Sequence, residues 1–252
     1  MGYQFVKFEI EDRVAVIKLI APIDGQNQLT RLSEEISGCC QKFKMNDENS
    51  VLVITEGVPG LFAIEKGTGS IGAGWPGDVS LSQSIAECER PVLIGIRGDA
   101  VDVGLEMALA CDLRIASETS RFGLRHVKAG VMPWDGGTQR LSRTIGKGKT
   151  LEMILTGELI DAQEANRIGL ISRIVPAEEV ITTVMRLAMD MASKSPISLE
   201  YCKEAIAKGM DLTLEQGLRL EADLYFLMHT TRDREQGIKA FREKRKPEFK
   251  GN

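Results

Sequence analysis

The sequence is poor in the residues that mark several large functional classes. Histidine occurs only twice in 252 residues, and no set of His, Cys and carboxylate residues has the spacing of metal ligands. There is no P-loop, and no G-x-G-x-x-G motif follows a predicted strand, so we expect no nucleotide bound in either of those ways. No apolar window approaches the ~18 residues of a membrane span, and the N-terminus lacks the basic start and apolar run of an export signal. The sequence thus predicts a cytoplasmic protein that binds neither a metal nor a membrane.

Cysteine pattern and net charge exclude two further classes. The five cysteines are scattered without a C-x-x-C pair, which favours buried free thiols in a reducing compartment over disulfides or zinc. They are Cys39, Cys40, Cys88, Cys111 and Cys202. The 32 basic residues against 36 acidic ones give a net charge of −4, and only the extreme C-terminus concentrates positive charge. A dedicated nucleic-acid binder is therefore not expected.

What is present is the composition and patterning of an α/β protein. With 43% hydrophobic and 27% charged residues, the chain can bury a full core. Alternating apolar residues over Phe5–Glu11 and Val14–Ile20 predict an opening β-hairpin, and apolar residues at helical spacing follow from Leu29 to Phe43. The short apolar runs Val51–Thr55 and Val92–Ile96 are typical of buried parallel strands separated by helices.

One glycine-rich segment interrupts this pattern. Gly57–Gly77 contains seven glycines and two prolines, too many for regular structure. It predicts a mobile loop that lies over a ligand site, because binding residues are often carried on loops. A surface insertion without a function is the alternative.

From Asp161 onward the pattern is mostly helical. DAQE at Asp161–Glu164 has the form of a capping box, Gly169 fits the position after a helix end, and Leu170–Val175 predicts a last strand. Further helices are predicted over Glu178–Ser193, Ile197–Lys208, Leu214–Met228 and Arg232–Lys244.

The most informative stretch is Val101–Gln139, where three acid or base residues stand at the ends of short elements joined by glycine turns. They are Glu106, His126 and Asp135. Proton transfer beside a carbonyl requires such groups next to exposed backbone N–H donors. Asp102 suits the N-cap of a helix with Glu106 in its first turn, and the first N–H groups of that helix could bind a developing oxyanion. A purely structural Glu106 that complements the helix dipole is the alternative.

The other two groups are open to similar pairs of interpretations. His126 could shuttle protons because its unperturbed pKa is near neutrality, about 6.5, or it could be a hydrogen-bonded structural histidine. Asp135 precedes two glycines that permit close backbone approach, but an aspartate before Gly-Gly is commonly only a turn or N-cap residue.

The C-terminal run from Phe241 to Pro247 mixes an aromatic ring with a dense cationic cluster. Such a cluster suits a phosphate-rich ligand, because Lys and Arg neutralise phosphates while Phe contacts a flat base. A solvated, charged end of a helix is the alternative.

Three blocks of sequence resemble the crotonase family of enoyl-CoA hydratases and isomerases. They are GLEMALACDLRIASETSRFG, AGVMPWDGGTQRLSRTIGKGKTLEMILTGELIDAQEANRIGLISRIVP and TTRDREQGIKAFREKRKPEFKG. The resemblance implies an α/β fold with a crotonase-like spiral of ββα units over residues 1–195. It implies a C-terminal helical region over residues 196–252 that mediates trimerisation and covers CoA. It also implies an acyl-CoA thioester substrate, no cofactor besides the CoA of that substrate, and a homotrimer or a hexamer built as a dimer of trimers.

The resemblance also implies roles for individual residues. In the family, two backbone N–H groups hold the thioester oxygen; here they match Val103 and either Ile64 or Glu65. The positions that match CoA contacts, which often cross a subunit boundary, are Ala63, Phe241 and Lys244.

Two of the acid/base candidates match family positions, and a third departs from the family pattern. Glu106 matches the first catalytic glutamate of the hydratases. Asp135 matches a functional aspartate of dienoyl-CoA isomerases, dihydroxynaphthoyl-CoA synthases and a benzoyl-CoA dehalogenase. The second hydratase glutamate is replaced by His126. The family's Gly-Gly-Gly reads Asp102-Val103-Gly104, and its Ala-Gly-x-Asp is absent from residues 63–66.

The leading hypothesis is an enoyl-CoA hydratase/isomerase-like lyase or isomerase. The two N–H donors would stabilise a thioester enolate, Glu106 would move a proton or activate water, and Asp135 or His126 would supply the second acid/base function. One alternative is a dienoyl-CoA isomerase-like or cyclic acyl-CoA ring chemistry centred on Asp135. The other is a catalytically silent CoA-binding subunit.

Overall fold

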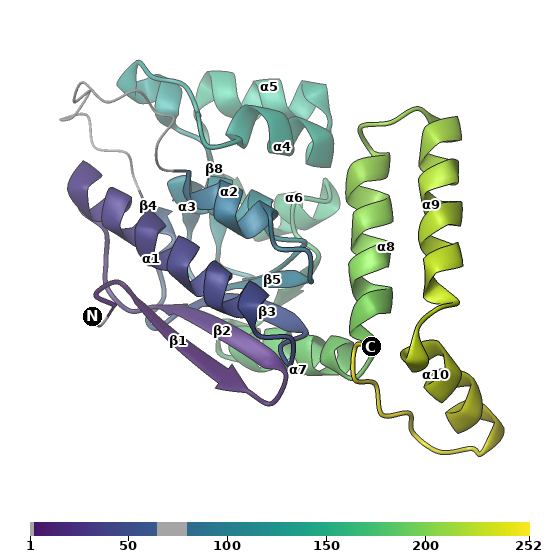
Figure 1. The fold of residues 1–252 in the computed structure, drawn as a ribbon. Helices are drawn as coiled ribbons and strands as arrows, with labels where there is room; N and C mark the ends of the chain where they lie inside the picture. The colour runs from purple at the N-terminus through teal and green to yellow at the C-terminus, as the bar shows by residue number, and fades with distance from the viewer. Residues whose placement is uncertain (1–2, 65–79) are drawn as a thin grey trace.

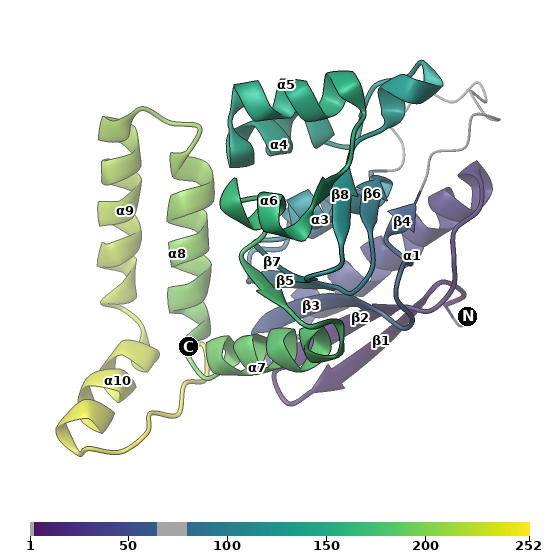
Figure 2. The ribbon, with the colours of Figure 1, turned by 180° about the vertical axis from the view of Figure 1, so that it is seen from behind.

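The computed structural model describes residues 3–64 and 80–252 and has two sheets joined by repeated ββα turns (Figures 1 and 2). The chain opens with the predicted hairpin, β1 (Val6–Glu11) antiparallel to β2 (Val14–Leu19). Helix α1 (Gln26–Met45) then buries the predicted apolar stripe from Leu29 to Phe43. Both sequence predictions are confirmed.

Each following ββα turn gives one strand to each sheet. β3 (Val51–Glu56), β5 (Val92–Ile96) and β7 (Leu113–Ser117) enter a six-stranded sheet of order β1-β2-β3-β5-β7-β10. β4 (Ala63–Ile64), β6 (Ala100–Asp102) and β8 (Arg121–Gly123) enter a four-stranded sheet of order β4-β6-β8-β9. Helices α2 (Leu81–Ala86) and α3 (Val103–Ala110) close two of these turns. This is the predicted spiral, and its strands β3, β5 and β7 are parallel neighbours.

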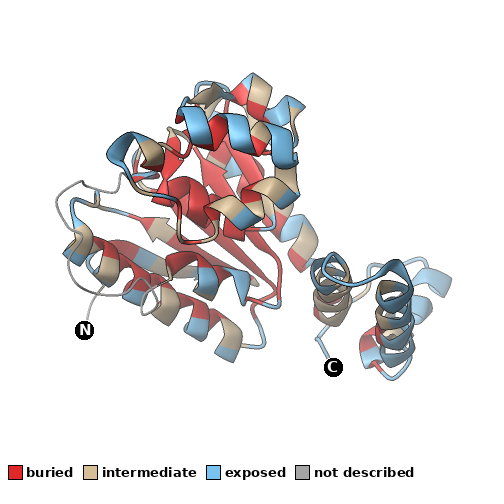
Figure 3. Cartoon of the chain, turned by 90° about the horizontal axis from the view of Figure 1, so that it is seen from above, coloured by how far each residue is buried: buried red, intermediate tan, exposed pale blue. Residues whose placement is uncertain are grey.

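The central strands β3 and β5 of the larger sheet are buried at every residue, which explains their continuous apolar runs (Figure 3). Val51 and Val53 of β3 face α7 (Val180–Ala192), where they join a cluster with Val180 and Val184. The alternate residues of β3 face the main core, which is covered by α1 and α3.

The predicted mobile loop is partly wrong. Its first residues, 57–64, are ordered and include β4, where Ala63 pairs with Val101 and Ile64 with Asp102 in a parallel register. Phe62 is fully buried and Leu61 nearly so, because their side chains enter the main core and hold the turn against it. Residues 65–77 of the predicted loop lie outside the described residues.

After β8 the chain forms a mostly helical segment that adds one short strand to each sheet. It comprises the 3₁₀ turn η2 (His126–Ala129), α4 (Gly137–Ile145), α5 (Lys147–Thr156), β9 (Ile160–Asp161), α6 (Ala162–Arg167) and β10 (Arg173–Val175). Asp161 caps α6 as predicted, since its side chain accepts a hydrogen bond from Glu164 N at 2.8 Å. Gly169 has the positive φ of 80° expected after a helix end.

Three helices extend away from the two sheets (Figures 1 and 2). The short 3₁₀ turn η3 (Ala177–Glu179) leads into α7, and these helices follow it: α8 (Pro196–Gly209), α9 (Leu214–Met228) and α10 (Arg232–Arg242). All four predicted C-terminal helices are present within a few residues of their expected bounds. Helix α8 begins at Pro196, and the side chain of Ser195 caps it; the division into two regions at this point stays a prediction.

Candidate active site

Glu106 lies in the first turn of α3, and its side chain is fully buried. Helix α3 begins directly at the end of β6, beside the chain that leads into β4. A Cβ atom on Gly104 would lie only 1.8 Å from the carbonyl oxygen of Phe62, so only glycine lets the helix start this close. The close approach fixes Glu106 one turn from the point where β4, β6 and α3 meet.

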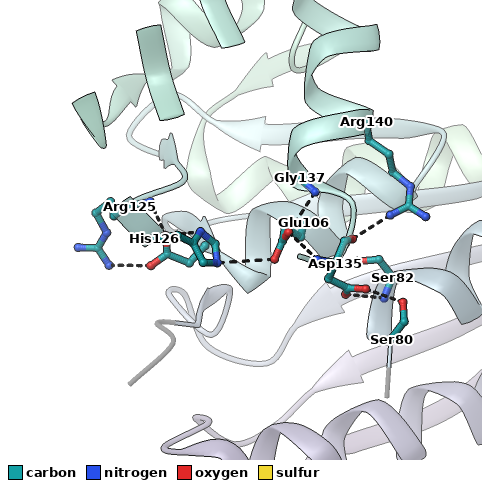
Figure 4. Close-up of polar contacts among 9 residues, drawn as sticks. Ser80, Ser82, Glu106, Arg125, His126, Asp135, Gly137 and Arg140 are labelled. Atoms are coloured by element: carbon teal, nitrogen blue, oxygen red, sulfur yellow. Dashed lines mark hydrogen bonds and ion pairs between the residues drawn. The ribbon is translucent and has the colours of Figure 1, made fainter. Parts of the chain in front are cut away.

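Two backbone N–H groups orient the Glu106 carboxylate, one just before α4 and one at its first residue. Its Oε1 accepts hydrogen bonds from Asp135 N at 2.9 Å and Gly137 N at 3.0 Å. The second oxygen, Oε2, faces His126, with 3.7 Å between Glu106 Oε2 and His126 Nε2. Figure 4 shows Glu106 lying between His126 and Asp135. The carboxylate therefore has a fixed orientation, with one oxygen directed at an imidazole.

His126 is not in an irregular loop as the sequence suggested, but is the first residue of the 3₁₀ turn η2, and its side chain is buried. The backbone N–H of the preceding Arg125 donates to the carboxylate of Asp102, which ties this turn to the end of β6. The same carboxylate lies 3.5 Å from His126 Nδ1, measured to Asp102 Oδ1. The imidazole thus stands between two buried carboxylates.

Asp102 occupies the predicted position before α3, but it does not cap the helix. Its side chain makes no capping hydrogen bond and turns instead toward Arg125 and His126. Its backbone adopts φ 50° and ψ −115°, which points the side chain away from the first N–H groups of the helix. The N-cap prediction is wrong for this physical reason.

The Asp135 side chain is directed away from His126 and toward the start of α2 (Figure 4). It accepts a hydrogen bond from the Ser80 hydroxyl and another from Ser82 N at 2.9 Å. Its backbone carbonyl accepts from the Arg140 guanidinium at 2.9 Å. The carboxylate therefore ties the first turn of α2 to the segment that precedes α4, while its backbone N–H orients Glu106.

The predicted oxyanion donors lie close together where they are described. The register of β4 and β6 sets Ile64 opposite Asp102, the residue before Val103, and both Ile64 and Val103 are buried. Ala63 is exposed beside them, and Glu65 lies outside the described residues. Their roles toward a thioester and CoA stay predictions.

The C-terminal CoA candidates are not brought to this site within one chain. Phe241 is 86% exposed on α10, which projects far from α3 in Figures 1 and 2, and Lys244 follows that helix.

The cysteines take no part in this arrangement. All five are free thiols, and the prediction of burial is correct for four but wrong for Cys202, which is exposed on α8. Burial raises the pKa values of the Cys39 and Cys111 thiols, which makes both poor nucleophiles. Over residues 3–64 and 80–252, no group of three His, Cys, Asp or Glu side chains is placed to hold a metal. Within the same ranges, no helix is long and apolar enough to cross a membrane.

Sequence reasoning missed Asp102, Ser80 and Ser82 as partners of the candidate residues. The pattern Ser80-x-x-Gln83 marks a helix start, and the Ser80 side chain does accept from Gln83 N at 2.9 Å. Nothing in the sequence indicated that the same hydroxyl donates to Asp135, 55 residues away.

The spiral of ββα turns, with a buried carboxylate and imidazole beside the first turn of α3, defines an α/β protein of the crotonase fold. The family model described as enoyl-CoA hydratase/isomerase matches residues 9–252. A probable enoyl-CoA hydratase of Rhizobium meliloti is 33% identical over 263 aligned positions that cover 99% of each chain. The 2,3-dehydroadipyl-CoA hydratase of Escherichia coli is 41% identical over 162 residues, 64% of each chain.

Solved structures agree with this relationship. An enoyl-CoA hydratase subunit I of Geobacillus kaustophilus superposes with a TM-score of 0.89 at 30% identity, covering 99% of both chains. An enoyl-CoA hydratase of Bacillus anthracis has a TM-score of 0.87 at 30% identity, covering 99% of this chain and all of that one. The chain belongs to the enoyl-CoA hydratase/isomerase family. The prediction of an acyl-CoA-processing enzyme of the hydratase/isomerase type is confirmed at that level.

Proposed function

We propose that this protein adds water across, or moves, the double bond of an α,β-unsaturated acyl-CoA thioester, with Glu106 and His126 as its acid/base pair. We choose this pair because Glu106 Oε2 and His126 Nε2 face each other at 3.7 Å and both side chains are buried. At 3.7 Å the two groups are just beyond hydrogen-bond reach, but contacts of this kind often shorten when a substrate binds, and the pair could then exchange a proton.

The chemistry of hydration divides between these two groups. As the oxygen of water bonds to the β carbon, its proton passes to one member of the pair. The electrons of the double bond move onto the thioester oxygen as an enolate, held by the N–H groups of Val103 and Ile64. The proton carried by the other member then goes to the α carbon and restores the thioester carbonyl. In isomerisation the same pair removes one proton and returns it at another carbon, and no water is consumed.

Ring chemistry centred on Asp135 has less support. Its carboxylate is held by Ser80 and Ser82 and is directed away from the imidazole. These two hydrogen bonds stabilise its charged form and fix its direction, which makes it a weaker base than a carboxylate without such donors. We therefore assign Asp135 the role of anchoring α2 and orienting Glu106 through its backbone N–H.

Hydration of crotonyl-CoA, followed by loss of the conjugated thioester absorbance, tests the assignment. We expect Glu106→Gln and His126→Gln each to lower kcat by roughly 10²–10⁴-fold, the usual contribution of general acid–base catalysis. Asp135→Asn should keep most of the activity, because its backbone N–H remains. If instead Asp135→Asn alone abolishes turnover while His126→Gln is active, the pair is wrongly assigned. If the wild-type protein turns over no member of an acyl-CoA panel, the function itself is wrong.

We further propose that the chain works as a homotrimer or hexamer in the cytoplasm, with no cofactor besides the CoA of its substrate. Support for assembly comes from α8 and α9, which bury only Pro196 and Leu224. Their large apolar side chains are extensively exposed, among them Ile206, Leu214, Leu218 and Phe226. Monomeric proteins rarely expose apolar surface on this scale, so partner subunits are needed to cover it. The cytoplasmic location stays a prediction.

A further inference from the structure

Asp102 adopts a backbone conformation that ordinarily belongs to glycine. Its φ of 50° with ψ of −115° is strained for any residue with a Cβ atom. Such strain persists where the surrounding structure holds the residue in place, and it clusters at functional sites. The side chain at this position therefore has contacts that offset the backbone cost.

Those contacts form a row of charged groups that ends at the proposed acid/base pair. Asp102 is 5% exposed, and its Oδ1 accepts the backbone N–H of Arg125. Its Oδ2 lies 3.6 Å from Arg125 Nη2, and its Oδ1 lies 3.5 Å from His126 Nδ1. On the opposite side of the imidazole stands Glu106. The imidazole thus lies between two carboxylates, and one of them, Asp102, is paired on its far side with the Arg125 guanidinium.

The two nitrogens of His126 face different carboxylates, and only one of these carboxylates belongs to the proposed pair. Either carboxylate favours a proton on the nitrogen that it faces, since an imidazole nitrogen must carry hydrogen to donate. Asp102 Oδ1 is the nearer of the two, at 3.5 Å from Nδ1 against 3.7 Å between Glu106 Oε2 and Nε2, which favours the proton on Nδ1. With Nδ1 protonated, the neutral ring presents the lone pair of Nε2 toward Glu106 Oε2. That is the tautomer in which Nε2 can exchange a proton with Glu106.

We propose that Asp102 is a positioning residue that keeps the proton on Nδ1 of His126 and so directs Nε2 at Glu106. The catalytic consequence rests on the proposed function, but the tautomer itself does not. Asp102 touches neither substrate nor the reacting atoms in this assignment; it acts through the imidazole.

The chain contains a matched control for this assignment. Asp99 accepts the backbone N–H of Arg121 at 2.9 Å and pairs with the guanidinium of the same residue, as Asp102 does with Arg125. Asp99 therefore joins the chain just before β6 to the start of β8, and Asp102 joins the end of β6 to the chain just after β8. Only Asp102 has a histidine ring against its carboxylate.

Nitrogen NMR of ¹⁵N-histidine protein reads the tautomer directly, because the chain has only His126 and the exposed His229. We expect neutral His126 of the wild-type protein to carry its proton on Nδ1. In Asp102→Asn the pKa of His126 should fall, because the imidazolium loses a neighbouring negative charge. In Asp102→Gly, whose backbone suits the positive φ, the preference for Nδ1 should weaken. His229 serves as the internal reference, and Asp99→Asn should leave His126 unchanged.

Kinetics with crotonyl-CoA give the second measurement. We expect Asp102→Asn to lower kcat by roughly 10–100-fold, the loss seen when a carboxylate that orients a metal-ligating histidine is removed. KM should stay within about twofold, because Asp102 makes no substrate contact. The lower limb of the pH profile should move with the NMR titration of His126, and Asp99→Asn should match the wild type.

Three results would overturn the inference. One is a neutral wild-type His126 with its proton on Nε2, which needs no variant to detect. The second is an Asp102→Asn protein in which both the His126 titration and kcat equal those of the wild type. The third is an equal loss of kcat in Asp99→Asn and Asp102→Asn, which would mean that only the tie to the chain around β8 matters. If the wild type turns over no acyl-CoA, the proposed function fails while the NMR result still decides the role of Asp102.

Discussion

Gly137 shows how little space surrounds the Glu106 carboxylate. A Cβ atom at this position would lie 2.9 Å from Glu106 Oε1 and 2.9 Å from Pro133 Cβ. The neighbours would have to shift, and the hydrogen bond from Gly137 N to Glu106 would be disturbed. We expect Gly137→Ala to destabilise the protein by about 1–3 kcal/mol, the usual cost of overpacking, and to lower kcat. Thermal unfolding and crotonyl-CoA hydration measure the two effects.

Gly148 is the matched control for that substitution. It lies in α5 with a φ that is not positive, and nothing stands within 4 Å of an added Cβ. Gly148→Ala should therefore be neutral or stabilising by about 0.4–1 kcal/mol, with unchanged kcat. Equal losses in both variants would show that any alanine is harmful in this region, and the argument from space at Glu106 would be lost.

At the same scale, the sequence narrowed the acid/base candidates to three but did not choose among them. Glu106 was identified through its place after a predicted strand and glycine, which is local information. The choice between His126 and Asp135 depended on which way each side chain points, and that is set by partners 20 to 55 residues away. The periodicity of the sequence carries no information on such long-range contacts. The pairing of Asp102 with His126 could therefore not be predicted from the sequence.

At the scale of elements, Glu56 joins one ββα turn to the next. It ends β3, is 1% exposed, and its Oε1 accepts from Arg97 N at 2.6 Å and Gly98 N at 3.0 Å. Its Oε2 accepts from Leu61 N at 2.8 Å, on the chain that leads to β4. All three groups that contact the Glu56 carboxylate are N–H donors. A glutamine side chain here would place its own NH₂ donors against one of these N–H groups and leave them unsatisfied. We expect Glu56→Gln to lower the free energy of unfolding by about 1–3 kcal/mol.

Urea unfolding at one fixed protein concentration checks the effect, since assembly would otherwise change the midpoint. Glu152→Gln provides the comparison, because the Glu152 side chain is 62% exposed and pairs only with Lys149 among the contacts described. Its cost should lie within about 1 kcal/mol. A Glu56→Gln midpoint as high as that of Glu152→Gln would refute the role of Glu56 in joining the turns.

Elements with strong local patterns were predicted well, and short ones were not. Helix α9 matched its expected bounds. Its apolar residues recur at helical spacing, and its capping residue Thr213 directly precedes them in the chain. β4 was missed because two residues make no alternation, and its strand form comes from pairing with β6. The glycines around it suggested disorder, whereas Gly60 serves a turn with φ 97° that directs Phe62 into the core.

On the scale of the whole molecule, the exposed apolar surface of α9 is the feature that needs covering. Phe226 and Leu214 are 72% and 80% exposed. We expect light scattering to give the mass of a trimer or a hexamer for the wild type, and Phe226→Glu to reduce it, because a charge buried in an apolar interface without a partner is costly. Glu221→Gln on the same helix keeps the assembly if the surface contact is apolar. A wild-type mass equal to the 27.7 kDa chain would contradict the assembly.

The sequence by itself determined the hairpin, the buried parallel strands and the C-terminal helices, because each depends on periodicity or capping among neighbours in the chain. The tertiary structure alone decided which acid/base groups meet, since the pairing of β6 with β8 brings His126 beside Asp102 and Glu106 of the preceding turn. It also turned Asp102 away from the helix it precedes, through a backbone angle that no residue pattern specifies. Contacts between distant segments are fixed by packing and register, which are properties of the assembled sheets and not of any one segment.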